Sequence, residues 1–289
     1  MRTDALGAAG VLLLALPFLG LPGLQAEAQT WSDFQASRQA QAESALSVEV
    51  VYGAGHFSLH PARSDRLYQV RMRYDEESFQ PIHSYQNGVL RVGTEGSSPG
   101  RRGFRRGGDF SESEMELRLG GTVPTDLKLE LGAVRSEIDL GGIRLRSVNL
   151  ATGASDTRVR VSRPNPMQMD SAVIQVGAAA FEGEGLGRLR ARQFKVDAGV
   201  GDVRLDFAGL ERSLTRLNVS MGLGSVHITI PAGVGIRLTR STFLTSVTAP
   251  DLTQDGEAYL SRDWEEAERQ IEIQVDAAFG SVTILREDA

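Results

Sequence analysis

The sequence predicts an all-β protein, a β-solenoid of repeated strand-kink-strand units with an N-terminal β region packed at one end. The first observation is a pattern of alternating apolar and polar residues that is broken by a cluster of small residues and recurs along the chain. The second is the spacing of these units, roughly 20 to 25 residues, which is typical of solenoid coils. The third is a composition of 32 glycines with 6% aromatic residues, which suits tight turns and slim apolar side chains.

The repeat is clearest in two segments that superimpose without a gap, FKVDAGVGDVRLDF at 194–207 and LNVSMGLGSVHITI at 217–230. Further copies occur at 48–59, 127–140, 148–161, 173–186 and 271–284. One unit cannot bury its apolar face alone, but stacked units place equivalent residues in a ladder with a spacing of about 4.8 Å. We expect one such ladder to contain Leu131, Leu150, Val176, Val196, Val219 and Val275.

The paired glycines Gly199 and Gly201 mark the break in the first of these segments. A glycine pair after a strand also occurs in dinucleotide-binding loops, but those loops carry a third glycine and lead into a helix whose N-terminus holds phosphate. Here the third glycine is missing, and the next residues, VRLDF, alternate as a strand does. The glycines therefore predict a bend in the backbone.

Before the repeats the chain is rich in β signals but less regular. RLYQVRMRYD at 66–75 alternates, and GVLRVGTE at 88–95 alternates after the hairpin signal Gln-Asn-Gly at 86–88. The segment at 31–45 predicts a short helix or a disordered N-terminus. We expect an N-terminal β domain at 29–125 and a β-repeat domain at 126–289.

The first 28 residues predict a secretory signal peptide. Arg2 precedes the apolar run at 10–24, and the Ala-Glu-Ala tripeptide at 26–28 has the small-x-small pattern of a signal-peptidase site. Pro17 and Pro22 interrupt the run, which is shorter than a membrane span of about 20 apolar residues. We therefore expect an exported protein, periplasmic or secreted, that is cleaved after Ala28 and has no transmembrane segment after cleavage.

Composition argues against several functional classes. The formal net charge of -6 gives no global basic field for nucleic acid. The absence of cysteine excludes disulfides, thiolate catalysis and cysteine-bound zinc. The sequence also lacks the motifs of zinc proteases, serine hydrolases and P-loop enzymes. We expect no catalytic residue, no cofactor, no metal and no nucleic-acid partner.

Acidic residues follow the kink in four consecutive units and are candidate interaction residues. They are Glu137, Asp156, Glu182 and Asp202. Stacking would align these carboxylates in one row, which could bind calcium or, in pairs, hydrolyse a glycan. The alternative is that the kink faces water and is polar for that reason.

A basic cluster interleaved with glycine is the second candidate. It contains Arg101, Arg102, Arg105 and Arg106. In the cell envelope these arginines could contact phosphate groups of a surface polymer through paired hydrogen bonds. The alternative is a flexible, solvated loop tip.

The run from residue 127 to the end resembles the bacterial toast-rack β-repeat proteins, through its G-x-G-(D/S)-V-x-(I/L) bends, SLTRLNVSMGLGSVHITIP at 213–231 and QIEIQVDAAFGSVTI at 270–284. That group includes the LiaF-type C-terminal domain of cell-wall stress regulators and adhesin-like repeat domains. VEVVYGAGHFSLHPARSDRLYQVRMRY at 48–74 and QPIHSYQNGVLRV at 80–92 resemble the N-terminal segment of toast-rack proteins.

The resemblance implies a non-enzymatic envelope protein, and it carries over no catalytic residue. The LiaF type is membrane-bound and restrains a two-component sensor, whereas this sequence has no multi-helix anchor and begins with the predicted signal peptide. We expect an interaction, scaffold or envelope-stress regulatory module that binds an envelope protein or cell-surface polymer through an extended β-repeat surface. The alternative is a carbohydrate-binding or carbohydrate-active β-helix protein that uses the carboxylates.

Overall fold

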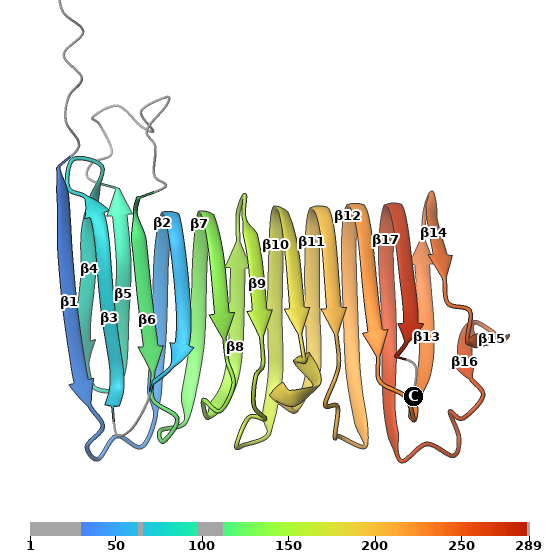
Figure 1. Ribbon diagram of the computed structural model, residues 1–289. Coiled ribbons are helices and arrows are strands. Elements are labelled where there is room, and N and C mark those ends of the chain that lie inside the picture. Colours follow the sequence, from blue (N-terminus) through green and yellow to red (C-terminus); the bar gives the residue numbers. More distant parts are fainter. Residues whose placement is uncertain (1–29, 63–65, 97–111, 288–289) are drawn as a thin grey trace, which may run out of the picture.

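The computed structural model describes residues 30–62, 66–96 and 112–287. Its strands lie side by side, each across the long axis of the molecule, and follow one another along that axis as a stack (Figure 1). In a full rung, one long strand bends near its middle, so its first half pairs with the first halves of its neighbours and its second half with their second halves. The apolar side chains lie between these two layers. The predicted β-solenoid is confirmed, whereas the predicted signal peptide lies outside the described residues.

The rungs follow one another as parallel neighbours. In spatial order they are β2 (Leu46–Pro61), β7 (Thr125–Asp139), β8 (Leu145–Thr152) with β9 (Asp156–Arg160), β10 (Met169–Glu184), β11 (Ala191–Asp206), β12 (Leu214–Ile230), β17 (Arg269–Arg286), and β13 (Val234–Thr242) with β14 (Thr245–Thr248). A short 3-10 helix, η1 (Leu186–Leu189), connects β10 to β11.

The last strand of the chain lies inside the stack. β17 pairs with β12 on one side and with β13 and β14 on the other, all in parallel. The chain therefore passes the position of β17, forms the terminal rung, and returns to fill the gap. The antiparallel hairpin of β15 (Leu252–Asp255) and β16 (Ala258–Ser261) then covers part of the edge of β13.

The N-terminal end of the stack is closed by antiparallel strands. Each half of β2 has its own neighbour here, β5 (Val89–Gly96) for the first half and β6 (Glu114–Leu119) for the second. β4 (Phe79–Gln86) pairs antiparallel with β5, and β3 (Arg66–Asp75) with β6. The predicted hairpin before β5 is confirmed, with positive φ angles of 50° at Asn87 and 78° at Gly88.

The segment predicted as a short helix or as disordered begins with a strand. β1 (Trp31–Gln39) pairs antiparallel with β3, from Trp31 opposite Asp75 onwards. Phe34 and Ala36 pack against the core from this strand. The prediction was wrong because the pairing edge offered by β3, rather than local propensity, determines the conformation of this segment.

The boundary expected between residues 125 and 126 falls at the start of β7. Rung β2, which precedes it, pairs with β7 from Leu46 opposite Thr125 to Leu59 opposite Ile138. The division of the chain into two domains stays a prediction.

The core consists of ladders of apolar residues contributed by successive rungs. The central ladder contains Val50, Leu129, Leu150, Ile174, Val196, Val219 and Val275, each paired with the next. All of them are buried. Two members of the expected ladder were misplaced: Leu131 pairs with Thr152, and Val176 pairs with Ala198. The error is two residues, which preserves the side of the strand because side chains alternate with a period of two.

The bend requires glycine in three consecutive rungs. Gly201, Gly224 and Gly280 have positive φ angles of 139°, 142° and 129°. A Cβ atom on Gly224 would lie 1.9 Å from the carbonyl oxygen of Gly201 in the neighbouring rung. The close approach of neighbouring backbones therefore excludes a side chain at this position, and the bend predicted at Gly201 is confirmed.

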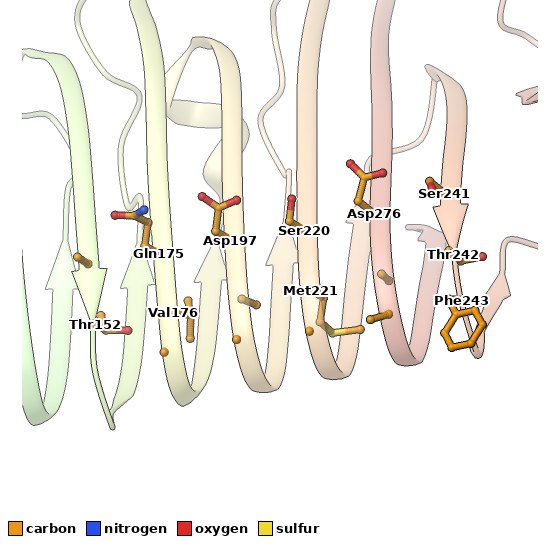
Figure 2. Close-up of a pocket in the computed structure, with 17 residues that line it drawn as sticks. Thr152, Gln175, Val176, Asp197, Ser220, Met221, Ser241, Thr242, Phe243 and Asp276 are labelled. Carbon is orange, nitrogen blue, oxygen red and sulfur yellow. The ribbon is translucent and has the colours of Figure 1, made fainter.

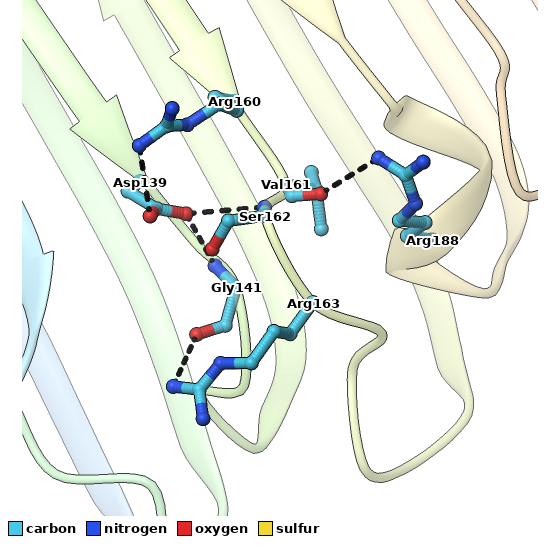
Figure 3. Close-up of polar contacts among 7 residues, drawn as sticks. All are labelled: Asp139, Gly141, Arg160, Val161, Ser162, Arg163 and Arg188. Atoms are coloured by element: carbon cyan, nitrogen blue, oxygen red, sulfur yellow. Dashed lines mark hydrogen bonds and ion pairs between the residues drawn. The ribbon is translucent and has the colours of Figure 1, made fainter.

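Asp139 stabilises the ends of the rungs, away from the bend (Figure 3). Its carboxylate accepts hydrogen bonds from the amides of Gly141 at 2.9 Å and Ser162 at 3.2 Å. Burial raises the pKa of this carboxyl, but the hydrogen bonds from Gly141 and Ser162 and the charge of Arg160 outweigh it, so the pKa lies below its usual value. Asp139 thus joins the connections that follow two adjacent rungs.

The glycine requirement predicts that Gly224→Ala lowers the free energy of unfolding by about 2 to 4 kcal/mol, because the added methyl group meets a backbone oxygen and the φ angle is strained. Urea unfolding followed by circular dichroism measures this loss. Gly96→Ala is the matched control, since its Cβ would have no heavy atom within 4 Å. Equal losses in the two variants would contradict the role of the bend.

We also expect Asp139→Asn to lower the free energy of unfolding at pH 7 by about 1.5 to 3 kcal/mol, because it weakens charge-assisted hydrogen bonds. The folded-state pKa lies below the unfolded value of about 3.9, so this contribution is complete above that value and is lost as the pH falls through the folded-state pKa. Urea unfolding at pH 7 and pH 3 should show the difference from wild type shrinking at pH 3. A difference of the same size at both pH values would refute the assignment; Asp170→Asn, at an exposed position, is the control.

Candidate interaction surface at the bend

The side chain at the outermost position of the bend is small in the early rungs and large in the late ones. Ala133, Ala154 and Ala178 occupy it in rungs from β7 to β10. Val200 pairs with Ala178 and Leu223, and Leu223 pairs with Phe279. Because neighbouring rungs are in register, these three large side chains form a row across β11, β12 and β17.

The terminal rung extends this row. Phe243 and Leu244 connect β13 to β14, and the ring of Phe243 packs edge-on against that of Phe279 with centroids 5.8 Å apart. Leu244 has a positive φ angle of 47°, which a non-glycine residue seldom adopts. We name Val200, Leu223, Phe243, Leu244 and Phe279 the apolar ridge.

The apolar ridge is exposed to solvent. Relative accessibilities are 49% for Val200, 53% for Leu223, 44% for Phe279, 66% for Phe243 and 71% for Leu244. Within the part of the chain that the structure describes, the other exposed large apolar residues are Val51, Val89 and Leu285. Most exposed large apolar side chains of the described residues are therefore gathered in one place.

A groove of 790 Å³ lies along the bend, with Phe243 at its far end (Figure 2). Gly177, Gly199 and Gly222 line it and contribute no side chains. Along the groove, outward-facing polar residues stand in one row, as direct partners on successive rungs: Gln175, Asp197, Ser220, Asp276 and Ser241. The groove thus combines an open backbone surface with a polar wall.

Polar residues flank the apolar ridge on both sides. On the first-half side they are Asp197, Ser220, Asp276 and Ser241, and on the second-half side Asp202, Ser225, Ser281 and Ser246. In these flanking positions the charged groups are three carboxylates, with no basic residue among them. Lys195 lies one step further out and forms an ion pair of 2.8 Å with Asp197. Arg204 occupies the corresponding outward position beyond Asp202, so the flanking positions themselves are acidic and basic residues follow directly outside them.

The predicted carboxylate candidates fall into two rows rather than one. Glu137 and Glu182 belong to one row, but Arg158 lies between them and forms an ion pair of 3.2 Å with Glu182. Asp156 and Asp202 belong to the other row, where Ala180 separates them. The expected single row is corrected because Glu137 and Glu182 lie two residues further along their strands than the row of Asp156 and Asp202, a shift that keeps all of them on the outer face.

The same residues have individual partners. Asp156 lies 4.0 Å from Arg135, and Asp202 accepts a hydrogen bond from Ser225. Asp202 is the one member of the set that borders the apolar ridge. The arginine cluster Arg101, Arg102, Arg105 and Arg106 lies outside the described residues. An interaction role for either group stays a prediction.

Sequence reasoning missed the apolar ridge, although a signal for it was present. The residue between the small bend residues changes from alanine to Val200, Leu223 and Phe279 along the repeats. A turn exposed to water gives no packing reason for that increase in size. Aligning the bends across the repeats would have shown it.

Among residues 30–62, 66–96 and 112–287, no group of three or more His, Cys, Asp or Glu side chains is arranged to hold a metal ion. In the same residues, no helix has the length and apolar character needed to cross a bilayer.

The rungs and the bend define a β-solenoid repeat protein. Residues 26–183 match the family described as "N-terminal domain of toast_rack, DUF2154", and the chain belongs to this family. Residues 187–284 match the family described as "Cell wall-active antibiotics response LiaF, C-terminal". The resemblance inferred from the sequence is confirmed.

Several solved structures are similar to this chain. A candidate cell-adhesion protein from Clostridium sporogenes aligns over 89% of this chain and 100% of its own, with 15% identity and a TM-score of 0.45. A candidate adhesin from Bacteroides fragilis aligns over 88% and 97%, with 11% identity and a TM-score of 0.37. A candidate lipid-binding protein from Parabacteroides distasonis aligns over 87% and 96%, with 11% identity and a TM-score of 0.33. Among curated proteins, none matches this sequence.

Proposed function

We propose that the protein is a non-catalytic, exported module of the bacterial cell envelope that holds a partner molecule against the apolar ridge. The toast-rack family and the match to the LiaF C-terminal domain support the envelope setting. The N-terminal apolar run followed by Ala-Glu-Ala supports export. The apolar ridge is the observation that carries the proposal.

A continuous row of exposed apolar side chains favours association. Burying a large apolar side chain contributes about 1.5 to 3 kcal/mol, and contiguous apolar patches on protein surfaces often mark binding sites. The flat outer faces of the stack differ from the ridge, because their charges are paired between rungs, as in Arg216 with Glu272 at 3.1 Å. The charged groups of these faces are therefore satisfied by water and by ion pairs within the face. The bend is therefore the preferred contact surface.

The positions of the carboxylates favour binding over glycan hydrolysis. Hydrolysis by a carboxyl pair needs one group to remain protonated and the other ionised across the scissile bond. Arg158 instead lies between Glu137 and Glu182 and forms an ion pair of 3.2 Å with Glu182, so a guanidinium rather than open space for a sugar separates the two carboxylates. An envelope polymer remains an outcome of the experiment below.

The test is capture from envelope extract with the wild-type protein and with a ridge variant that carries Val200→Ser, Leu223→Ser and Phe279→Ser. We expect the wild-type protein to retain a specific component that the ridge variant loses. The matched control carries Ala133→Ser, Ala154→Ser and Ala178→Ser, at the same position of earlier rungs, and should retain it. Thermal unfolding should confirm that both variants fold.

Equal retention by the ridge variant and the wild-type protein would contradict the proposal. Separate identification of captured protein and polysaccharide shows the class of partner. Turnover of a glycan by the wild-type protein, abolished by a single carboxylate substitution, would replace the proposal with the carbohydrate-active alternative.

A further inference from the structure

We infer that the occupant of the apolar ridge is an amphipathic, cationic α-helix of a partner polypeptide, which lies along the stack and crosses the rungs. The inference rests on the proposed function and names the chemistry of the partner. Three features of the bend support it: the pairing state of the backbone, the spacing of the apolar residues, and the charge of the flanks.

Along most of the apolar ridge the backbone has no capacity to accept another strand. Val200 and Leu223 lie in strands that are paired on both sides, β11 with β10 and β12, and β12 with β11 and β17. Strand addition needs a free sheet edge, and among the ridge residues Phe243 and Leu244 alone lie next to one, because β14 pairs with β17 on one side. A helix satisfies its own backbone hydrogen bonds and can bind through side chains alone. Across Val200, Leu223 and Phe279 the occupant is therefore a helix rather than an added strand.

The spacing of the ridge suits a helix. Its side chains come from successive rungs, about 4.8 Å apart, whereas successive turns of an α-helix are about 5.4 Å apart. Over the three to four rungs of the ridge the mismatch stays near 2 Å or below, within the reach of flexible side chains such as Leu and Met. One apolar residue per turn, at i, i+3 or i+4, and i+7, would meet Val200, Leu223 and Phe279 in order.

The flanking positions favour positive charge, and because Asp197 already forms an ion pair with Lys195, this preference rests mainly on Asp202 and Asp276. Asp197 and Asp276 stand on the first-half side and Asp202 on the second-half side, with serines at the other flanking positions. Basic side chains on either side of the apolar stripe of a helix would meet these carboxylates. Gly177, Gly199 and Gly222 leave the intervening backbone open, so long Lys or Arg side chains can extend across it toward Asp197 and Asp276.

The same charges disfavour two other occupants. A second copy of this chain, docked ridge against ridge, would bring Asp197, Asp202 and Asp276 of both copies close together. An anionic lipid surface would meet the same three carboxylates. A partner with a neutral or acidic helix would gain the apolar contacts but no compensation for the flanks. A cationic amphipathic helix satisfies both the apolar and the charged parts of the surface.

The direct test is fluorescence anisotropy with a labelled 18-residue helical peptide that carries a leucine stripe flanked by lysines. Two comparison peptides are used, one with glutamate in place of lysine and one with the same composition in scrambled order. We expect the lysine peptide to bind, and the glutamate and scrambled peptides to bind at least tenfold more weakly. Equal binding of the lysine and scrambled peptides would overturn the inference, as would no binding of the lysine peptide.

Variants of the protein distinguish binding at the apolar ridge from attraction to the overall negative charge of the protein. Leu223→Ser with Phe279→Ser leaves the net charge unchanged and should weaken binding of the lysine peptide about tenfold or more. Asp197→Asn with Asp276→Asn should weaken it severalfold and reduce its dependence on salt. Ala133→Ser with Ala178→Ser is the control and should bind as the wild-type protein does. Unchanged affinity in the Leu223→Ser, Phe279→Ser protein would show attraction to overall negative charge and would overturn the inference.

Two further measurements identify the competing occupants. Sedimentation equilibrium that shows a dimer, lost on Leu223→Ser with Phe279→Ser, would assign the ridge to a second copy. Flotation with anionic vesicles, lost in the same variant, would assign it to lipid. If the ridge variant loses the envelope component but the lysine peptide does not compete with that component, the proposed function stands and the helical partner is rejected. If the ridge variant retains every component, the proposed function itself fails.

Discussion

Parallel, in-register pairing between neighbouring rungs is the interaction on which the rest of the structure depends. It places residues of the same repeat position beside one another, so one apolar residue per unit becomes a continuous ladder from Val50 to Val275. It also brings the bends of neighbouring rungs so close that Gly224 faces the carbonyl oxygen of Gly201 without room for a side chain. Core and bend therefore impose one register, and each reinforces the other.

The same register organises the outside of the molecule. On the flat faces it places Arg158 between Glu137 and Glu182, so charges alternate along the stack instead of repelling. At the bend it places Val200, Leu223 and Phe279 in one exposed row. A repeat that changes slowly along the chain thus generates a surface that differs between its two ends, with alanines at the early bends and large apolar side chains at the late ones. Membership of the toast-rack family accounts for the stack, whereas the large apolar side chains at the late bends distinguish one end of it from the other.

Much of the fold follows from the sequence, because period-two alternation and glycine bends are local signals. The hairpin at Asn87 and the strand at 66–75 were predictable for the same reason. Three features depend on long-range pairing and left no local signal. β1 acquires its conformation from the edge of β3. β17 inserts between β12 and β13, and its pairing with these two strands, rather than its local sequence, determines that position. The positions of Leu131 and Val176 were misaligned by two residues, a shift that alternation alone cannot detect.

For the candidate surface, the sequence identified the bend but not its chemistry. Of the carboxylates that the sequence indicates as candidates, Asp202 borders the apolar ridge, whereas Val200, Leu223 and Phe279 lie between small residues in a pattern typical of a turn.

The central claim is that the late bends form the contact surface, and site-specific photo-crosslinking in the living cell tests it most directly. A photoreactive amino acid is placed at Leu223 in one strain and at Ala133, the same bend position in an early rung, in another. We predict a discrete adduct from position 223 and none from position 133. Adducts of equal yield from both positions, or an adduct from position 133 alone, would contradict it.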